Sequence, residues 1–274
     1  LWIVLCMNVS AGIGIIGAAA PMLQETFGGA LIGHSDLGFA DLKKDESLLA
    51  LAAAVGAGFV GLISLFNIFG RFFWASISDK LGRKLTYIVF FTLGILMYVT
   101  ASYMTGSKSL ALFAACFCII ASMYGGGFAT IPAYLADMFG TQFVGAIHGR
   151  ILTAWSTAGI LGPVIVNYMH DMRVEAQVPF SEIYAPIFYI LASMLAIGFI
   201  ANLMVRPMDN KFFMTDKELL TEKKLAHEKF ISTKETIGKA EKTPLITFLA
   251  WSAVGVPISY GIWSTIQKAW ILFH

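Results

Sequence analysis

Two arginines lie inside long apolar stretches of this sequence, and their chemistry needs an explanation first. Arg71 lies in the apolar run of residues 47–78 and Arg150 in the run of residues 143–169, and neither run contains an acidic residue. An ionisable side chain at the centre of a membrane helix costs about 2.5 to 3.5 kcal/mol on insertion scales, so such residues mark functional sites. A guanidinium stays charged and can bind a carboxylate through two parallel hydrogen bonds. The pair therefore favours binding of a small organic anion.

Both arginines are expected at a similar depth. Arg71 precedes Asp79 by eight residues and Arg150 follows Thr141 by nine. At 1.5 Å per residue, each then lies about 12 to 14 Å from the same face of the membrane. Asn67 lies one helical turn before Arg71 and shares its face, where it can orient the guanidinium or donate to a substrate oxygen. The alternatives for each arginine are a carboxylate partner elsewhere in the protein, or a side chain that extends to the membrane surface.

The elements that must position these residues are membrane helices. Of the 274 residues, 57% are hydrophobic and 13% are charged, which is about half the charged fraction of an ordinary soluble domain. The mean hydropathy is +0.74. A bilayer core requires about 20 consecutive apolar residues per helix, and irregular backbone is not tolerated in lipid. The sequence therefore predicts an all-α membrane protein. Its seven predicted spans cover residues 1–24, 47–78, 85–104, 110–135, 143–169, 183–205 and 244–273.

The distribution of charge divides the chain into three predicted parts. Residues 206–242 contain nine Lys or Arg and seven Asp or Glu, a density that cannot bury a core. We expect a six-helix bundle over residues 1–205, a charged linker over residues 206–242, and an additional transmembrane helix over residues 243–274. Basic residues gather in the Lys80 to Lys84 turn and in the linker, so the positive-inside rule places both on the cytoplasmic side.

Several functional classes have no support in the sequence. The net charge is +2, and the lysines are not interleaved with aromatic residues as in nucleic-acid-binding surfaces. The three cysteines lie in apolar runs without histidines at metal-ligand spacing. Gly12 to Gly17 matches the dinucleotide-binding glycine pattern, but it lies inside a membrane-length run, where glycines serve close helix packing. We expect no cofactor, no metal, no catalytic residues and no enzymatic activity.

Two motifs resemble those of a known transporter family. The turn Ser78-Asp79-Lys80-Leu81-Gly82-Arg83-Lys84 resembles the conserved loop of the major facilitator superfamily, which in its C-terminal half joins the eighth and ninth of twelve helices. The segment that runs from Tyr124-Gly125-Gly126-Gly127-Phe128 to Val144-Gly145-Ala146-Ile147-His148-Gly149-Arg150 resembles the oxalate/formate antiporter family. Asn67-Ile68-Phe69-Gly70-Arg71 resembles the eighth helix of that family, and the related monocarboxylate transporters place a substrate-binding arginine there.

The resemblance implies a fold, an activity and a set of residues. It implies the six-helix C-terminal half of a major facilitator bundle, helices seven to twelve, plus one additional helix. It also implies alternating-access transport of a small carboxylate such as formate or oxalate, by antiport or with protons. The expected substrate-binding residues are Arg71, Asn67, Arg150, Trp155 and Tyr124. The expected gating residues, at two Asp-x-x-Gly helix ends and the adjoining turn, are Asp79, Gly82, Arg83 and Asp137.

One departure from the family bears on the substrate. The oxalate carrier of this family is associated with a lysine in the eleventh helix, where this sequence has Trp155. A second cation is therefore missing, which favours a monocarboxylate or another weakly charged anion and leaves oxalate as an alternative. His148 is a group that can titrate near neutral pH and couple a proton.

The expected partners are a small carboxylate, the lipid bilayer of the cell membrane and a preceding half of the same polypeptide. The chain opens at Leu1 without an initiator methionine or a signal-peptide pattern, so we expect it to be the later part of a longer protein. Two other functions stay open. The chain can be a non-transporting membrane subunit, or part of a carrier for another class of small molecule such as sugars or drugs.

Overall fold

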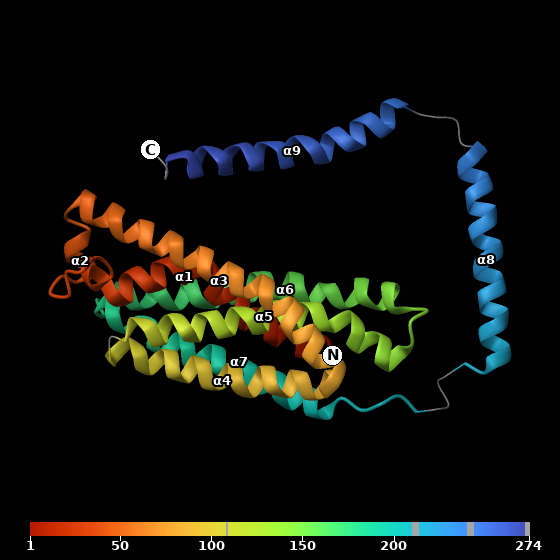
Figure 1. Cartoon of the computed structure of the whole chain (residues 1–274), viewed down its shortest axis with the longest axis horizontal. Helices are drawn as coiled ribbons and strands as arrows, with labels where there is room; N and C mark the ends of the chain where they lie inside the picture. The colour runs from red at the N-terminus through yellow and green to blue at the C-terminus, as the bar shows by residue number, and fades with distance from the viewer. Residues whose placement is uncertain (108, 210–213, 240–243, 272–274) are drawn as a thin grey trace. The chain divides into compact units, whose positions relative to one another are not determined.

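The computed structural model describes residues 1–107, 109–209, 214–239 and 244–271. Within them the chain is helical and contains no strand (Figure 1). The elements in chain order are α1 (Trp2–Phe27), η1 (Gly28–Ile32), α2 (Phe39–Leu42), α3 (Glu46–Leu81), α4 (Arg83–Ser107), α5 (Leu110–Phe139), α6 (Val144–Glu175), η2 (Phe180–Glu182), α7 (Ala185–Met204), α8 (Asp216–Lys239) and α9 (Pro244–Ile271).

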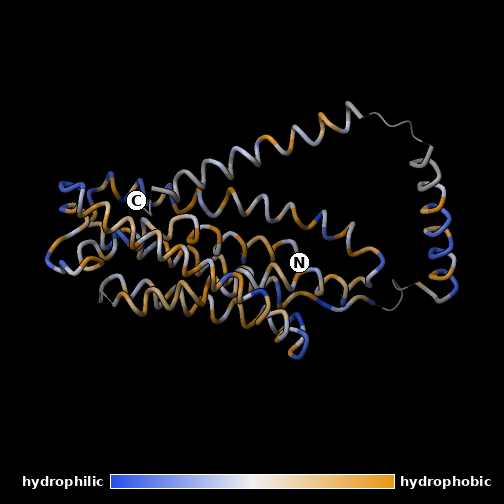
Figure 2. The backbone as a smooth tube through the Cα atoms, turned by 45° about the horizontal axis from the view of Figure 1, so that its top comes forward, coloured by the Kyte–Doolittle hydropathy of each residue, from blue (hydrophilic) through white to orange (hydrophobic). Residues whose placement is uncertain are grey.

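Six helical stretches among the described residues are long and apolar enough to cross a membrane. They are Trp2–Ile32, Glu46–Leu81, Arg83–Thr105, Leu110–Phe139, Val144–Glu175 and Phe180–Met204. These stretches correspond to the first six predicted spans, so the predicted all-α membrane fold is confirmed. Figure 2 shows hydrophobic positions along the long helices and hydrophilic positions gathered at helix ends and in α8.

The charged segment differs from the expectation, because it contains the helix α8, which was not predicted. A capping box signals its start, because Glu218 Oε2 accepts hydrogen bonds from the backbone N and the hydroxyl of Thr215, each at 2.8 Å. α9 forms at the seventh predicted span, and Thr247–Pro257 within it is an apolar stretch. Its crossing of the membrane stays a prediction. Residues 210–213, 240–243 and 272–274 of these segments lie outside the described part.

The chain divides into two units, residues 1–207 and 208–274. The first unit contains all the residues for which a function was predicted. In it, α1 packs most extensively against α6, α3 against α5, and α4 against α7.

Small residues allow the closest of these helix crossings. A Cβ added to Gly70 of α3 would lie 2.1 Å from the carbonyl oxygen of Ser122, and one added to Gly125 of α5 would lie 2.2 Å from that of Asn67. At the crossing of α1 with α6, a Cβ on Gly14 would lie 3.2 Å from the carbonyl oxygen of Gly162. The helix-packing role expected of the Gly12 to Gly17 segment is thus confirmed at Gly14.

Other glycines of the bundle do not lie at such close crossings. Gly17, Gly58, Gly61, Gly145 and Gly149 have nothing within 4 Å of an added Cβ among the described residues. Their sides of α1, α3 and α6 are not covered by another described helix, so the packing role expected for Gly17 stays a prediction.

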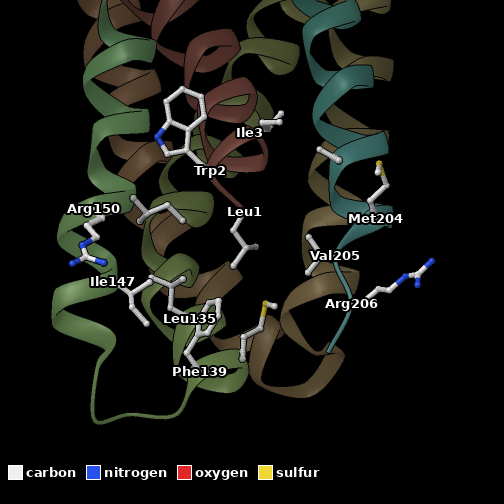
Figure 3. Close-up of a pocket in the computed structure, with 13 residues that line it drawn as sticks. Leu1, Trp2, Ile3, Leu135, Phe139, Ile147, Arg150, Met204, Val205 and Arg206 are labelled. Carbon is white, nitrogen blue, oxygen red and sulfur yellow. The ribbon is translucent and has the colours of Figure 1, made fainter. Parts of the chain in front are cut away.

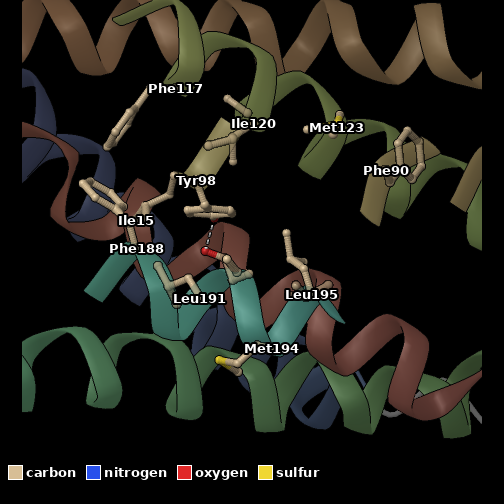
Figure 4. Packing of buried hydrophobic residues seen from close by; sticks show 14 of the residues in the cluster. Ile15, Phe90, Tyr98, Phe117, Ile120, Met123, Phe188, Leu191, Met194 and Leu195 are labelled. Atoms are coloured by element: carbon tan, nitrogen blue, oxygen red, sulfur yellow. Dashed lines mark hydrogen bonds between the residues drawn. The ribbon is translucent and has the colours of Figure 1, made fainter. Parts of the chain in front are cut away.

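Buried tyrosines join α4 to its neighbours in the core. The hydroxyl of Tyr98 donates to the carbonyl oxygen of Ala11 at 2.7 Å, and that of Tyr87 donates to Gly127 at 2.6 Å. Both side chains are at most 1% exposed. Figure 4 shows Tyr98 among apolar side chains that include Phe188 and Leu191 of α7. A buried hydroxyl needs such a partner, so these bonds fix which carbonyls α4 lies beside.

The helix ends on the side of the Lys80 to Lys84 turn are held by specific polar contacts. Gly82 and Gly140 have φ values of +84° and +76° and end α3 and α5, a conformation that favours glycine. Lys84 Nζ donates to the carbonyl oxygens of Leu203 and Val205 at 3.0 and 2.6 Å. It thereby satisfies carbonyls at the end of α7 that have no partner within the helix.

Candidate functional site

Arg71 of α3 lies beside a cluster of three aromatic rings. Its guanidinium carbon is 5.7 Å from the ring centroid of Phe128 on α5. The Phe128 and Trp155 rings lie 4.6 Å apart in an edge-to-face arrangement, and the Tyr124 and Trp155 centroids are 5.8 Å apart. α3, α5 and α6 thus each contribute to one site, in which Arg71 lies within the range of a cation–π contact.

The crossing of α3 and α5 positions this arginine. Gly70 and Trp74 lie on the buried face of α3 and contact α5, where Trp74 Nε1 donates to the hydroxyl of Ser122 at 3.2 Å. Arg71 follows Gly70 directly, so its side chain leaves the helix at the edge of that contact and is exposed in this chain. The short Gly70 to Ser122 approach is what brings the Arg71 side chain within reach of Phe128.

Arg71 has no acidic partner among the described residues. They include no carboxylate within ion-pair distance of its guanidinium, which lies beside the Phe128 ring. An unpaired guanidinium among aromatic rings can bind the carboxylate of a small ligand, while the rings contact its apolar atoms.

Asn67, a further predicted site residue, lies next to Tyr124 of this cluster. The carbonyl and amide oxygens of Asn67 lie 2.2 and 3.1 Å from the position of a Cβ on Gly125, the residue after Tyr124. Tyr124 itself packs its side chain against Gly12 of α1, where no larger residue would leave room for the ring. The structure thus brings Arg71, Asn67, Tyr124 and Trp155 into one region.

Arg150, the remaining predicted site residue, lies elsewhere. It lines a cavity of about 630 Å³ with Trp2, Phe139 and Arg206, at the first turns of α1 and α6 and the last turns of α5 and α7. Figure 3 shows Arg150 and Arg206 on opposite sides of this cavity. Arg150 precedes Trp155 by five residues, about 7.5 Å along the helix axis. No described contact joins Arg150 to Arg71, and Arg71 does not line this cavity, so a substrate-binding role for Arg150 stays a prediction.

The predicted gating residues meet at the same end of the bundle as Arg150. Arg83 donates to Asp79 at 2.5 Å and to Asp137 at 3.3 Å, and it also contacts the hydroxyl of Ser78. Its side chain is 14% exposed, whereas Asp79 and Asp137 are 67% and 60% exposed. Gly82 provides the tight turn before Arg83. One arginine therefore connects the end of α3, the start of α4 and the end of α5.

Sequence reasoning missed Phe128, although it lies in the quoted motif four residues after Tyr124 and therefore on the same face of α5.

Sequence reasoning also missed a polar cluster at the opposite end of the bundle. There His170 was expected in a loop after residue 169, but α6 continues to Glu175. In this extended part of the helix, His170 Nε2 lies 2.9 Å from Oε2 of Glu25 on α1. The signal for this cluster in the sequence is Glu25, a single acidic residue at the end of the first apolar run.

Comparison with known proteins identifies transporters. The model of the Major Facilitator Superfamily matches residues 1–270. The oxalate:formate antiporter of Oxalobacter formigenes is 36% identical over 115 residues, which is 42% of this chain. The glucose transporter GlcP of Staphylococcus epidermidis is 28% identical over 161 residues, or 56% of the chain. The apicoplast pyruvate carrier 2 of Toxoplasma gondii is 27% identical over 108 residues, or 39% of the chain.

These matches cover less than a third of each relative. They span 27%, 32% and 16% of the lengths of the antiporter, the glucose transporter and the pyruvate carrier.

Proposed function

We propose that this chain, which belongs to the Major Facilitator Superfamily, forms part of a secondary carrier that moves a small monocarboxylate by alternating access. The family and its six apolar helices make it a multi-pass membrane protein, consistent with the plasma membrane. The family and the names of its relatives indicate a transporter and not an enzyme. The observation that carries the proposal is the unpaired guanidinium of Arg71 beside Phe128.

Arg71 is the substrate-binding residue of this proposal. A charged side chain in a membrane helix needs an opposite charge, and Arg71 has none among the described residues. A substrate carboxylate supplies that charge during binding and takes it away on release. Asn67 and Tyr124 lie close enough to the cluster to donate hydrogen bonds to the second carboxylate oxygen.

An uncharged ring at position 155 favours a substrate with a single negative charge. The Arg71 cluster contains one cation and three aromatic rings, and Arg150 lies in a separate cavity. One guanidinium matches one carboxylate, whereas a dianion such as oxalate would leave its second charge beside the Trp155 ring. Formate, acetate and pyruvate fit this arrangement better than oxalate.

Two of the three relatives support this substrate class. An oxalate:formate antiporter and a pyruvate carrier are named for small carboxylates. The first of them is more similar to this chain than the glucose transporter is, at 36% against 28% identity. The membership of the narrower oxalate/formate antiporter family is part of the proposal.

Arg83 has a gating role in this proposal, because its contacts hold one end of the bundle closed. Major facilitator carriers open a midplane site to one side at a time by rocking two halves that are related by internal repeats. The contacts of Arg83 with Asp79 and Asp137 hold three helix ends together, and we propose that they break when this end opens. The exposed apolar side chains of α3, among them Phe69 and Phe72 at 68% and 71% exposure, suit contact with lipid or with a preceding half of the polypeptide.

A carrier for a neutral sugar is the second candidate. The glucose transporter match extends over the largest share of this chain, 56%. This candidate leaves Arg71 without a ligand charge, so it predicts that the arginine is dispensable for binding.

The experiment that tests the proposal is uptake in proteoliposomes that contain the intact carrier. Liposomes loaded with unlabelled substrate are diluted into labelled formate, acetate, pyruvate, oxalate or glucose, and exchange is followed. We expect exchange of at least one monocarboxylate, slower exchange of oxalate and none of glucose. Exchange of glucose alone would contradict the proposal, as would the absence of any carboxylate exchange by protein that folds.

A further inference from the structure

A cluster of ionisable side chains joins three helices at the end of the bundle opposite Arg83. Glu25 Oε2 of α1 accepts a hydrogen bond from the hydroxyl of Tyr184, at the start of α7, at 2.9 Å. The same oxygen lies 2.9 Å from Nε2 of His170 on α6, and His170 Nδ1 lies 3.1 Å from Oδ1 of Asp171. The anion site described above uses none of these residues.

The cluster is mostly withdrawn from solvent. The Glu25 side chain is 10% exposed and that of His170 is 24% exposed, whereas Asp171 is 75% exposed. The His170 and Tyr184 rings also pack together, with centroids 5.5 Å apart. An acidic group at this depth is costly without partners, and Glu25 has two.

The hydrogen-bond geometry determines how many protons the cluster holds. A neutral imidazole has one N–H donor and one acceptor nitrogen, and an ionised carboxylate only accepts. Both ring nitrogens of His170 face carboxylate oxygens within hydrogen-bond distance. A neutral His170 and two ionised carboxylates can form only one of these two hydrogen bonds. Both form when the cluster holds one additional proton.

We propose that Glu25, His170, Asp171 and Tyr184 form a proton-binding site that holds the ends of α1, α6 and α7 together while the proton is bound. Loss of the proton removes one of the two His170 hydrogen bonds and leaves two carboxylates around a neutral ring. By linkage, a conformation that binds the proton more tightly is favoured by acidification. Acid therefore favours the closed arrangement of these helix ends.

The surrounding charges are consistent with this role. Arg173, the nearest arginine along α6, donates to the backbone oxygen of Glu182 at 3.1 Å and not to the cluster. Asp36 of the α1–α3 connection shares with Glu25 the lining of a cavity of about 440 Å³. Among the described residues, His170 contacts Glu25, Asp171 and Tyr184, so two acidic groups and one phenol face it.

Two of the helices that meet here, α1 and α6, contain a proline that allows the helix to bend. Pro21 lies in α1 four residues before Glu25, and Pro163 lies in α6 seven residues before His170. A proline inside a helix removes a backbone hydrogen bond and allows a bend. The segments beyond the prolines can separate when the cluster loses its proton. The 440 Å³ cavity beside Glu25 is lined by residues 25–28, 30, 35–40 and 179–181, so this separation would widen it.

Distances between spin labels across that cavity test the proposal. In the intact carrier, Ser35→Cys and Ser181→Cys are labelled, and the distance distribution is measured at about pH 5.5 and about pH 8, on either side of an ordinary histidine titration. We expect a short distance at low pH and a longer one at high pH. In His170→Gln the distribution should be the same at both values. His34→Gln, which changes an exposed histidine of the same end, should keep the wild-type response.

Asp171→Asn is a second variant whose exposed side chain makes misfolding a minor concern. Removal of one carboxylate from His170 should move the midpoint of the distance change to lower pH, by about one unit or less. A wild-type distribution that does not respond to pH would overturn the proposal, as would a response that survives His170→Gln. The measurement requires no substrate, so its outcome is separate from that of the carboxylate exchange experiment.

Discussion

Arg83 Nε lies 3.3 Å from Oδ2 of Asp137, and this contact ties the start of α4 to the end of α5. The same guanidinium binds Asp79 at the end of α3 at 2.5 Å. Because the arginine is mostly buried and both acids are mostly exposed, the arginine is the fixed member of the group.

Replacement of Asp137 should loosen this end of the bundle. Asp137→Asn removes one ion pair of Arg83, which is worth at most about 1 kcal/mol and changes a conformational equilibrium up to about five-fold. We expect faster labelling of Met138→Cys by a membrane-impermeant thiol reagent. Glu175→Gln, which changes an exposed charge at the other end of the bundle, should leave the labelling rate unchanged. If Met138→Cys is labelled at the same rate in Asp137→Asn and Glu175→Gln, Asp137 has no gating role.

Gly70 should tolerate no side chain. A Cβ there would lie 2.1 Å from the backbone oxygen of Ser122 and 2.5 Å from its Cα, and backbone atoms cannot rotate away. Gly70→Ala should destabilise the bundle by about 1 to 3 kcal/mol and displace Arg71 from Phe128. The measurement is the melting temperature in detergent. Gly58→Ala in the same helix is the matched control, because nothing lies within 4 Å of its Cβ position; an equal loss in both would contradict the crossing.

Asn202 should be required for the packing of α7 against α4 and α5. Its amide donates to the carbonyl oxygen of Lys84 at 3.0 Å, and its side-chain oxygen accepts from Tyr134 at 3.3 Å. The residue is 0% exposed, so Asn202→Ala leaves buried partners unsatisfied at about 1 to 3 kcal/mol each. Thermal unfolding measures the loss. Ser193→Ala on an exposed position of α7 should change stability by less than about 0.5 kcal/mol.

Trp155 should determine the preferred charge of the substrate. Trp155→Lys places a second cation beside the Phe128 ring, 4.6 Å from the present indole centroid. We expect the ratio of oxalate to formate exchange to rise, by about tenfold for each 1.4 kcal/mol of added attraction. Trp155→Phe keeps an aromatic ring and should leave the ratio near that of the wild type. A ratio that does not change in Trp155→Lys would place the second carboxylate elsewhere.

The sequence predicted the fold better than it predicted the site. Runs of apolar residues define six spans because a membrane helix needs a fixed apolar length, and that signal lies in consecutive residues. Arg71 and Asn67 could be assigned to one face because both lie on one helix, four residues apart. Their relation to Trp155 depended on how α3, α5 and α6 cross, and the spacing of Arg71 and Arg150 from helix ends did not contain that information.

The polar cluster at the Glu25 end shows the same limit. Glu25 and His170 are 145 residues apart, and each alone resembles an ordinary charged residue at the end of a span. Only the parallel packing of α1 and α6, which brings the C-terminal ends of both helices together, makes them partners. α8 was missed for a different reason. The capping box of Thr215 and Glu218 is present in the sequence, but the high charge density of residues 206–242 indicated a linker without a buried core.

The most direct test of the central claim is monocarboxylate exchange by Arg71 variants of the intact carrier. We expect Arg71→Gln to reduce exchange at least about 100-fold, since a lost charged partner costs about 3 kcal/mol or more. Arg71→Lys should retain part of the activity because it keeps the charge, and Arg150→Gln should retain more than Arg71→Gln because Arg150 lies outside the aromatic cluster. If folded Arg71→Gln protein exchanges the carboxylate at the wild-type rate, Arg71 is structural and the anion site lies elsewhere.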